Sequence, residues 1–242
     1  IGRGDSSLFN IGHKPVGLAP FEAYLRDLQI YLSGGTLDAN GYDSTLKWLP
    51  NMTQAKVPVD IAATGPKVIA IGARHAERVT FSVGASEERV QWALAHVRET
   101  LGPEAALPEM GLYLNVCVDD DIDRAAEMAR GWVGIFAHFT GMPGAPRDRV
   151  RQDDHHTFDR LGDYDKQRHG RPDAAHAQAL PLEFIQRFAI VGPPEACVER
   201  LNALCGLGVQ RLFLTFPRQD QFGDAARTVT ERFACEVLPQ IK

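Results

Sequence analysis

The turn at residues 64–67, Thr-Gly-Pro-Lys, has the residue types of an anion-binding site. Apolar residues alternate from Val57 to Ile61 before it, which is typical of a β-strand, and helical spacing begins at Val68. A strand that runs into a helix through so short a turn directs amide donors and the positive end of a helix dipole to one point. The sequence therefore predicts that this turn binds a phosphate group.

Each residue of the turn has a local role in this interpretation. Thr64 is expected to cap the helix, and Pro66 suits the first helical position, where its missing N–H costs no hydrogen bond. Gly65 leaves the backbone uncovered, and Lys67 could add a positive charge. Turns of this kind also occur where no ligand binds, so the turn alone leaves both interpretations open.

The composition limits the classes of function. Of the 242 residues, 44% are hydrophobic, which is enough for a single domain with a large core. The formal net charge is -5, and Lys and Arg are interspersed with Asp and Glu, which argues against a nucleic-acid partner. No apolar run approaches the ~20 residues of a membrane span, and no signal-peptide pattern precedes the first expected strand. We therefore expect a cytoplasmic protein without a membrane or nucleic-acid partner.

Cysteine and histidine spacing predicts no metal site. The chain has four cysteines without a C-x-x-C pair: Cys117, Cys197, Cys205 and Cys235. They lie in apolar stretches, so we expect buried, reduced thiols. Residues 153–156, with His169 and His176 downstream, are of metal-ligating types, but their spacing fits no usual site. We interpret this segment as a solvated loop, and a lid over the pocket is the alternative.

Strands and helices alternate along the rest of the chain. We expect strands at 57–61, 78–83, 112–118 and 211–216, and helices at 20–33, 66–76, 86–98, 119–139, 193–206 and 224–237. The alternation favours a parallel α/β sheet with right-handed crossovers. Residues 142 to about 182 are expected to form an inserted region within a single domain, 1–242. About four or five strand–helix units fit either an open doubly wound sheet or part of a barrel.

Four motifs connect the chain to a known family. They are Gly-Arg-Gly-Asp-Ser at 2–6, Ile-Gly-His-Lys-Pro at 11–15, Ala-Ala-Thr-Gly-Pro-Lys at 62–67 and Phe-Ala-Ile-Val-Gly-Pro-Pro at 188–194. With these motifs the chain resembles the luciferase-like monooxygenase family of flavin- and deazaflavin-dependent oxidoreductases, which includes proteins like methylenetetrahydromethanopterin reductase. The resemblance covers essentially the whole chain and implies an α/β fold of the (β/α)8 TIM-barrel type.

The chain departs from the family pattern in two places. Family members usually begin with about three further βα units, none of which precedes Ile1 here, so the barrel is expected to be incomplete. The family often has Ala-Asp-Gly after the helix of the turn, where this chain has Ala-Glu-Arg at 76–78. The close backbone approach that the glycine allows is therefore not expected here.

The resemblance implies a cofactor site at the carboxyl ends of the strands. The residues expected to bind the cofactor are Ala63, Thr64, Gly65, Pro66 and Lys67 at its phosphate, with Arg3, Asp5 and Ser6. His13 and His75 are candidates on the substrate side. Asp5 and Ser6 could instead form a hydrogen-bonded turn, and His75 could complement a helix dipole. No catalytic residue is assigned, because the cofactor carries the chemistry.

The implied function is that of an oxidoreductase that transfers a hydride between a reduced coenzyme and a small organic substrate, with coenzyme F420 as the leading cofactor. An FMN-dependent monooxygenase is the first alternative. The second is a non-catalytic, truncated barrel that needs a partner or forms a homodimer through unpaired strand edges. The third is a phosphate-binding enzyme with a doubly wound sheet, unrelated to flavins, and the strand order distinguishes it.

Overall fold

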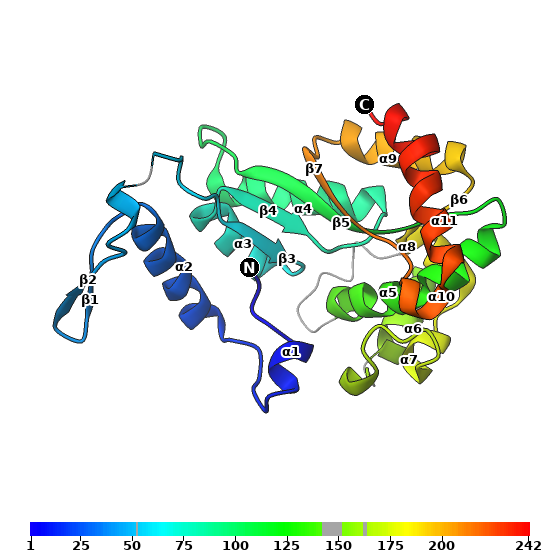
Figure 1. Ribbon diagram of the computed structural model, residues 1–242, viewed down its shortest axis with the longest axis horizontal. Coiled ribbons are helices and arrows are strands. Elements are labelled where there is room, and N and C mark those ends of the chain that lie inside the picture. The colour runs from blue at the N-terminus through cyan, green and yellow to red at the C-terminus, as the bar shows by residue number, and fades with distance from the viewer. Residues whose placement is uncertain (52, 142–151, 162–163) are drawn as a thin grey trace.

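A computed structural model describes residues 1–51, 53–141, 152–161 and 164–242. In these residues the centre of the molecule is a five-stranded parallel sheet (Figure 1). Its strands are β3 (Asp60–Ala63), β4 (Arg78–Phe81), β5 (Glu109–Val118), β6 (Ile190–Gly192) and β7 (Arg211–Thr215). β3 pairs with β4, and β4 with the start of β5. β7 then pairs with Gly111–Asn115 of β5, and β6 with Val116–Val118.

The strand order identifies the type of α/β fold. β3, β4 and β5 follow one another in the sheet as they do in the chain, and β7 lies beyond β5. A doubly wound sheet reverses its order at a switch point, and the described strands show no such reversal. The parallel α/β architecture is therefore confirmed, and the doubly wound alternative is wrong.

The start of the chain extends the sheet beside β3. The terminal amine of Ile1 donates to the Asp60 carbonyl (2.6 Å), and the Ala62 N–H donates to the Ile1 carbonyl (2.8 Å). Ile1 therefore bonds to the two residues on either side of Ile61, and this is the hydrogen-bond pattern of parallel strands. The segment that leads to Arg3 therefore ends at the same edge of the sheet as β3.

An ion pair across the face of the sheet shows that the sheet curves. Arg211 Nη1 of β7 lies 2.9 Å from Asp60 Oδ2 of β3. The two strands are separated by β4 and β5, which in a flat sheet would place them about 14 Å apart. Thr80 Oγ1 of β4 also donates to Asp60 Oδ2 (2.9 Å). The sheet therefore bends toward itself, as it does in a barrel.

Helices on the outside of the sheet enclose the main core. They include α3 (Pro66–His75), α4 (Glu87–Leu101), α9 (Pro194–Gly206) and the π-helical turn η4 (Phe233–Val237). The chain between β7 and its end also forms α10 (Gln219–Phe222), α11 (Asp224–Arg232) and η5 (Leu238–Gln240), and Val229 of α11 belongs to a second core. α3 and α4 lie side by side behind β3 and β4 (Figure 1). Ile69, Leu94 and Phe81 are fully buried between these helices and the sheet. No helix in the described part of the chain is long and apolar enough to cross a membrane.

The segment that interrupts the alternation packs against the long helix α5 (Ile122–Gly141). Its described part contains α6 (Gln152–Arg160), η3 (Lys166–Arg168), α7 (Ala175–Gln178) and α8 (Leu182–Phe188). Phe158 and Phe184 meet edge to face in the second core, with ring centroids 5.4 Å apart. Residues 142–151 and 162–163 of the expected insertion lie outside the described residues.

An arm near the N-terminus projects from the body of the molecule (Figure 1). It contains β1 (Leu37–Ala39), β2 (Tyr42–Ser44) and η1 (Leu49–Asn51). The short helix α1 (Ser6–Phe9) and the helix α2 (Leu18–Leu32) precede it, and α2 buries Phe21 and Leu25 in the main core. Asn40 and Gly41 connect β1 to β2 with positive φ angles of 58° and 85°, as a type I′ hairpin turn requires. This hairpin is not among the elements expected from the sequence, although an Asn-Gly pair is the usual signal for one.

The strand before the turn is shorter than the sequence predicts. β3 begins at Asp60, whereas the prediction starts the strand at Val57, which is 65% exposed. The N–H of Val59 donates a hydrogen bond to the Glu77 carboxylate (2.8 Å). A side chain therefore replaces the strand partner at this position.

The helix after the turn is capped differently from the prediction. Gly65 is the N-cap residue, and its carbonyl accepts from the N–H groups of Val68 (3.1 Å) and Ile69 (3.0 Å). No side chain caps α3, so the prediction that Thr64 does so is wrong. Pro66 is confirmed at the first helical position.

Two of the four free cysteines are buried, as expected. Burial raises the pKa of Cys117 to about 12 and that of Cys197 to about 11. Cys205 is partly exposed. The expectation is wrong for Cys235, which is exposed because η4 turns it to solvent.

Candidate functional site

A cavity of about 560 Å³ opens at the carboxyl ends of β3 and β4. Its walls include Gly2–Asp5, Thr64–Val68, Ser82, Tyr113, Phe136 and Phe139. These residues come from the chain start, the turn after β3, the end of β4, the strand β5 and the helix α5. Ligands in barrel proteins bind at this end of the strands.

The turn at 64–67 forms one wall of the cavity with its backbone uncovered. A methyl group at Gly65 would meet no heavy atom within 4 Å. The amide of Lys67, at the second helical position, has no acceptor within its own helix. Ala63 is buried at the end of β3, so its side chain does not reach the cavity. The turn therefore offers main-chain donors and the α3 dipole to an anion.

Residues from the chain start reach the same cavity. Arg3 lines it and donates from Nε to the Val16 carbonyl (2.5 Å). Asp5 lines it as well and is only 8% exposed. Ser6 is buried beside Asp5, with its Oγ 3.3 Å from Asp5 Oδ2. The structure therefore brings Arg3 and Asp5 together with the turn, and places Ser6 directly behind them.

The two histidines expected on the substrate side do not lie in the described cavity wall. His13 is in an exposed loop after α1. His75 ends α3, and the nine steps of the helix from Pro66 place it about 14 Å away along the helix axis. Its Nε2 lies 2.7 Å from Glu22 Oε1, and hydrogen bonding by His75 lowers the pKa of Glu22. His75 therefore joins α3 to α2, away from the cavity.

Sequence reasoning missed the residues that surround Asp5. Lys166 pairs with Asp5 Oδ1, and His138 Nε2 lies 3.7 Å from Asp5 Oδ2. His169, which the sequence assigns to a solvated loop, is partly buried with its Nδ1 3.0 Å from Ser6 Oγ. No spacing rule connects these positions, because they meet only where α1 and η3 pack together beside α5.

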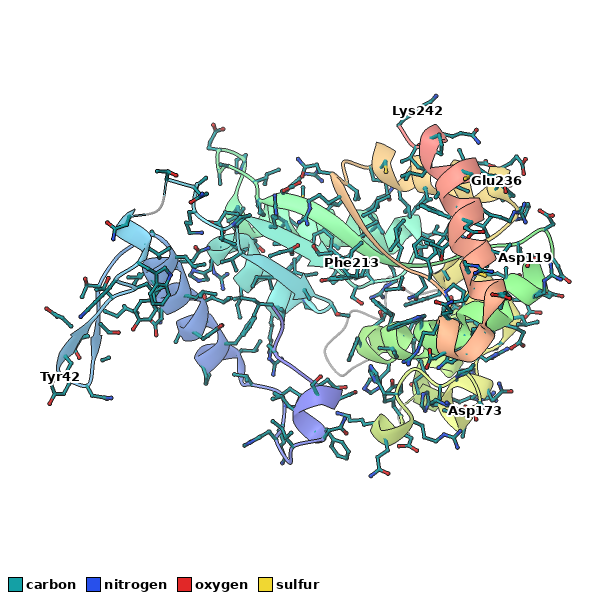
Figure 2. The ribbon with its side chains drawn as sticks, in the orientation of Figure 1. Tyr42, Asp119, Asp173, Phe213, Glu236 and Lys242 are labelled. Atoms are coloured by element: carbon teal, nitrogen blue, oxygen red, sulfur yellow. The ribbon has the colours of Figure 1, made fainter. Side chains whose placement is uncertain are left out.

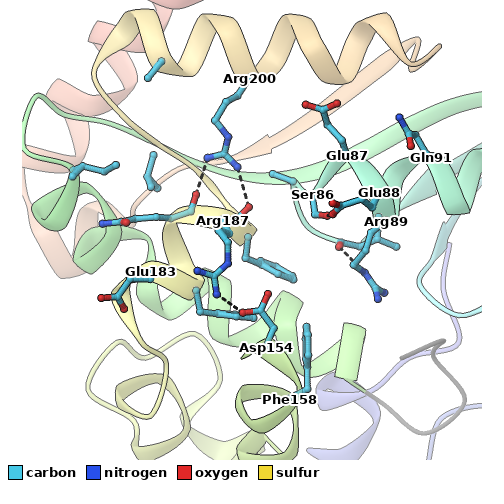
Figure 3. Close-up of a pocket in the computed structure, with 18 residues that line it drawn as sticks. Ser86, Glu87, Glu88, Arg89, Gln91, Asp154, Phe158, Glu183, Arg187 and Arg200 are labelled. Carbon is cyan, nitrogen blue, oxygen red and sulfur yellow. Dashed lines mark hydrogen bonds and ion pairs between the residues drawn. The ribbon is translucent and has the colours of Figure 1, made fainter. Parts of the chain in front are cut away.

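A second, larger cavity of about 890 Å³ lies among α4, α6, α8 and α9 (Figure 3). It shares no described wall residue with the first cavity. Arg200 points at the end of α8, where it donates to the carbonyls of Gln186 (2.8 Å) and Arg187 (2.9 Å). Arg187 in turn pairs with Asp154. Because these two arginines hold the helices together, we place the candidate site in the first cavity.

Curved parallel strands with an open turn and a cavity at their carboxyl ends are typical of cofactor-binding α/β barrels. The sequence profile of the family described as "luciferase-like monooxygenase" matches residues 5–211. The chain therefore belongs to the luciferase-like monooxygenase family, and the resemblance of its motifs to this family is confirmed.

Several solved structures share the fold of this chain. The coenzyme F420 dependent tetrahydromethanopterin reductase from Methanopyrus kandleri is 18% identical with a TM-score of 0.67, and the match covers 100% of this chain and 73% of that one. An F420-dependent secondary alcohol dehydrogenase, in complex with an F420-acetone adduct, is 16% identical with a TM-score of 0.68, over 100% and 68%. The monooxygenase RslO1 from Streptomyces bottropensis is 16% identical with a TM-score of 0.55, over 98% and 67%. Among curated proteins, none matches the chain.

Proposed function

We propose that the chain is a coenzyme F420-dependent oxidoreductase that transfers a hydride between the coenzyme and a small organic substrate in the cytoplasm. Membership of the luciferase-like family supports an oxidoreductase or a monooxygenase. Two of the structural relatives are named as F420-dependent enzymes. The observation that carries the proposal is the uncovered turn at Gly65, which faces a cavity of about 560 Å³.

The wall residues fit a ring cofactor that carries a phosphate. The amides and the lysine of turn 64–67 would hold the phosphate, and Arg3 adds a second positive charge. Tyr113, Phe136 and Phe139 offer an apolar wall for a flat ring. The bound coenzyme would supply or accept the hydride, while these residues bind and orient it.

An FMN-dependent monooxygenase is the second candidate. The same turn would hold the phosphate of FMN, because the main-chain donors recognise the phosphate and not the ring. A monooxygenase is also among the structural relatives.

A third candidate is a non-catalytic barrel that needs a partner chain or forms a homodimer. Among the described strands β7 has no neighbour on its outer edge, and Phe213 on this strand is 55% exposed (Figure 2). The chain also spans only 73% and 68% of the first two relatives. Unpaired strand edges promote association.

A fluorescence titration of the chain with F420 and with FMN separates these candidates. We expect saturable binding of F420, weakened in Lys67→Gln and unchanged in Lys47→Gln, an exposed lysine on the projecting arm. Binding of FMN in place of F420 would favour the monooxygenase. Binding of neither cofactor would contradict both and leave the non-catalytic candidate.

A further inference from the structure

A buried polar cluster lies directly behind the wall of the candidate site. We define the Asp5 cluster as Asp5, Ser6, His138, Tyr164, Lys166 and His169. Its members come from the start of α1, from α5 and from the segment around η3. Asp5 is the member that lines the cavity. A residue of the cavity wall is thus joined through its carboxylate to several groups that can carry a proton.

Hydrogen bonds connect Asp5 to His169. Ser6 Oγ lies 3.3 Å from Asp5 Oδ2 and 3.0 Å from His169 Nδ1. Because a hydroxyl both donates and accepts, Ser6 can pass a proton from the carboxyl group to the imidazole. The Tyr164 hydroxyl lies 2.7 Å from the same Nδ1. Two oxygens beside Nδ1 are therefore available to stabilise the ring when it carries the proton.

The charges around the cluster suit this transfer. Lys166 occupies Asp5 Oδ1, which leaves Oδ2 to face Ser6 and His138. Burial lowers the pKa of His138 and of His169, although Asp5 acts in the opposite direction on both. Both imidazoles are therefore neutral at pH 7 and can accept a proton. His169 is only partly buried, so it connects the cluster to solvent.

Other groups around the cluster complete its electrostatic surroundings. They are Asp165, Arg168 and His176. The His176 ring lies 4.1 Å from the Tyr164 ring and is also neutral at pH 7, because burial lowers its pKa. Burial raises the pKa of Tyr164, so its hydroxyl stays protonated. None of these groups lies between Asp5 and the cavity, because Asp5 itself forms the wall.

We propose that Asp5 is the general base for an alcohol substrate and that Ser6 and His169 carry its proton to solvent. The inference rests on the proposed function, because the bound oxidised coenzyme accepts the hydride. The O–H bond of the alcohol breaks and its proton goes to Asp5 Oδ2. The bound coenzyme would accept the hydride as the C–H bond breaks with both electrons and the C=O bond forms. The proton then passes through Ser6 Oγ to His169 Nδ1 and on to water.

The first test compares Asp5→Asn with Asp173→Asn in the F420-loaded enzyme. Asp173 is also paired with arginine, but its side chain is 56% exposed and it is not among the described cavity residues. The probes are propan-2-ol, cyclohexanol and benzyl alcohol. We expect Asp5→Asn to lower kcat about 100-fold or more at F420 concentrations that saturate the variant, as judged from its fluorescence-measured Kd. Asp173→Asn should leave both values unchanged.

The second test follows the pH profile of His169→Asn. In the wild type, kcat should fall as the pH drops through the pKa of His169, because a protonated ring cannot accept the proton. Asn places an amide near the position of Nδ1 but does not titrate in this range, so kcat should be lower and the acid limb should disappear. A structural role would lower kcat and leave the acid limb in place.

The third test needs no coenzyme. Because Asp5 raises the pKa of His138 and of His169, Asp5→Asn should lower both values in an NMR titration of the histidine rings. Asp173→Asn should change neither. Unchanged histidine titrations in Asp5→Asn would overturn the proposed coupling.

The outcomes separate this inference from the proposed function. If the enzyme binds F420 but oxidises none of the three alcohols, or if Asp5→Asn keeps its kcat, the inference is overturned and the proposed function stands. If F420 does not bind, the proposed function fails and the inference fails with it. If Asp5→Asn does not fold, Ser6→Ala takes its place, and an unchanged kcat in that variant overturns the inference.

Discussion

Gly65 lies where a side chain would stand between the turn and the cavity. Its φ of -100° and ψ of 160° are open to any residue, so backbone strain does not require glycine there. The space in front of it is open, since a methyl group would meet nothing within 4 Å. Access of a ligand to the main chain is therefore the physical reason for glycine at this position.

We expect Gly65→Ala to fold normally and to weaken coenzyme binding about tenfold, or about 1.4 kcal/mol, because the methyl group obstructs the phosphate. Fluorescence titration measures the Kd. Gly206→Ala is the matched control, since a methyl group there also meets nothing within 4 Å but lies at the end of α9. Equal Kd values for Gly65→Ala and the wild type would contradict a phosphate site at the turn.

Single residues also show where sequence reasoning about the site fails. The turn could be recognised because its residue types and their spacing are local. His75 could not be placed, because α3 carries it away from the carboxyl end of the sheet. The partners of Asp5 could not be found either, since Lys166 is 161 residues away along the chain.

At the scale of elements, Glu77 holds the junction between α3 and β4. Its carboxylate accepts from Lys56 Nζ (2.7 Å), Gln29 Nε2 (3.0 Å) and the Val59 N–H (2.8 Å). Burial acts to raise its pKa, but these hydrogen bonds outweigh burial and lower the pKa to about 2. A glutamate at this position, where the family often has aspartate, therefore connects three segments.

Glu77→Gln should be less stable than the wild type at pH 7. Because the pKa is lowered on folding, the contribution of Glu77 is present above its usual value of 4.5 and is lost as the pH falls toward about 2. The side chain is 44% exposed, so solvent screening limits the effect to about 1 kcal/mol or less. Urea unfolding at pH 7 and pH 3 measures it, and a difference that does not shrink at pH 3 would contradict it. The exposed Glu231→Gln should be neutral at both pH values.

One arginine satisfies the carbonyl groups at the end of α8. Arg200 is partly buried and donates to the carbonyl groups of Gln186, Arg187 and Ala189. We expect Arg200→Met to lower the free energy of unfolding by about 1–3 kcal/mol, because three partly buried carbonyls lose their donors. Arg227→Met, at an arginine that is 59% exposed, should change it by less than about 0.5 kcal/mol. Similar urea midpoints for the two variants would contradict this role of Arg200.

At the scale of the whole molecule, the sheet formed by the described strands has an open edge at β7. Phe213 projects from β7 and packs only partly on Tyr113, with ring centroids 4.7 Å apart (Figure 2). If the edge pairs with a second copy, Phe213→Lys should shift the chain to a monomer in sedimentation equilibrium, because a charge on an edge strand opposes pairing. Tyr42→Lys, at the 77% exposed tip of the hairpin, should not. A wild type that stays monomeric at every concentration would contradict this association.

Some features of the fold could be predicted from the sequence, and others could not. The alternation of strands and helices predicts a parallel α/β sheet, and the sheet is confirmed. The curvature was expected from the family resemblance but not from the periodicity, because the Arg211–Asp60 pair that shows it joins residues 151 positions apart. The hairpin at Asn40 and Gly41 was local enough to predict and was missed.

The local units of this protein, including the strand, turn and helix around Gly65, were determined by the sequence alone, because apolar periodicity and backbone preferences act over a few residues. Which polar side chains share the cavity was decided only by the tertiary structure. Asp5, His138 and Lys166 meet because α5 and the segment around η3 pack against the start of the chain. Such contacts depend on packing between distant segments, which spacing along the chain does not specify.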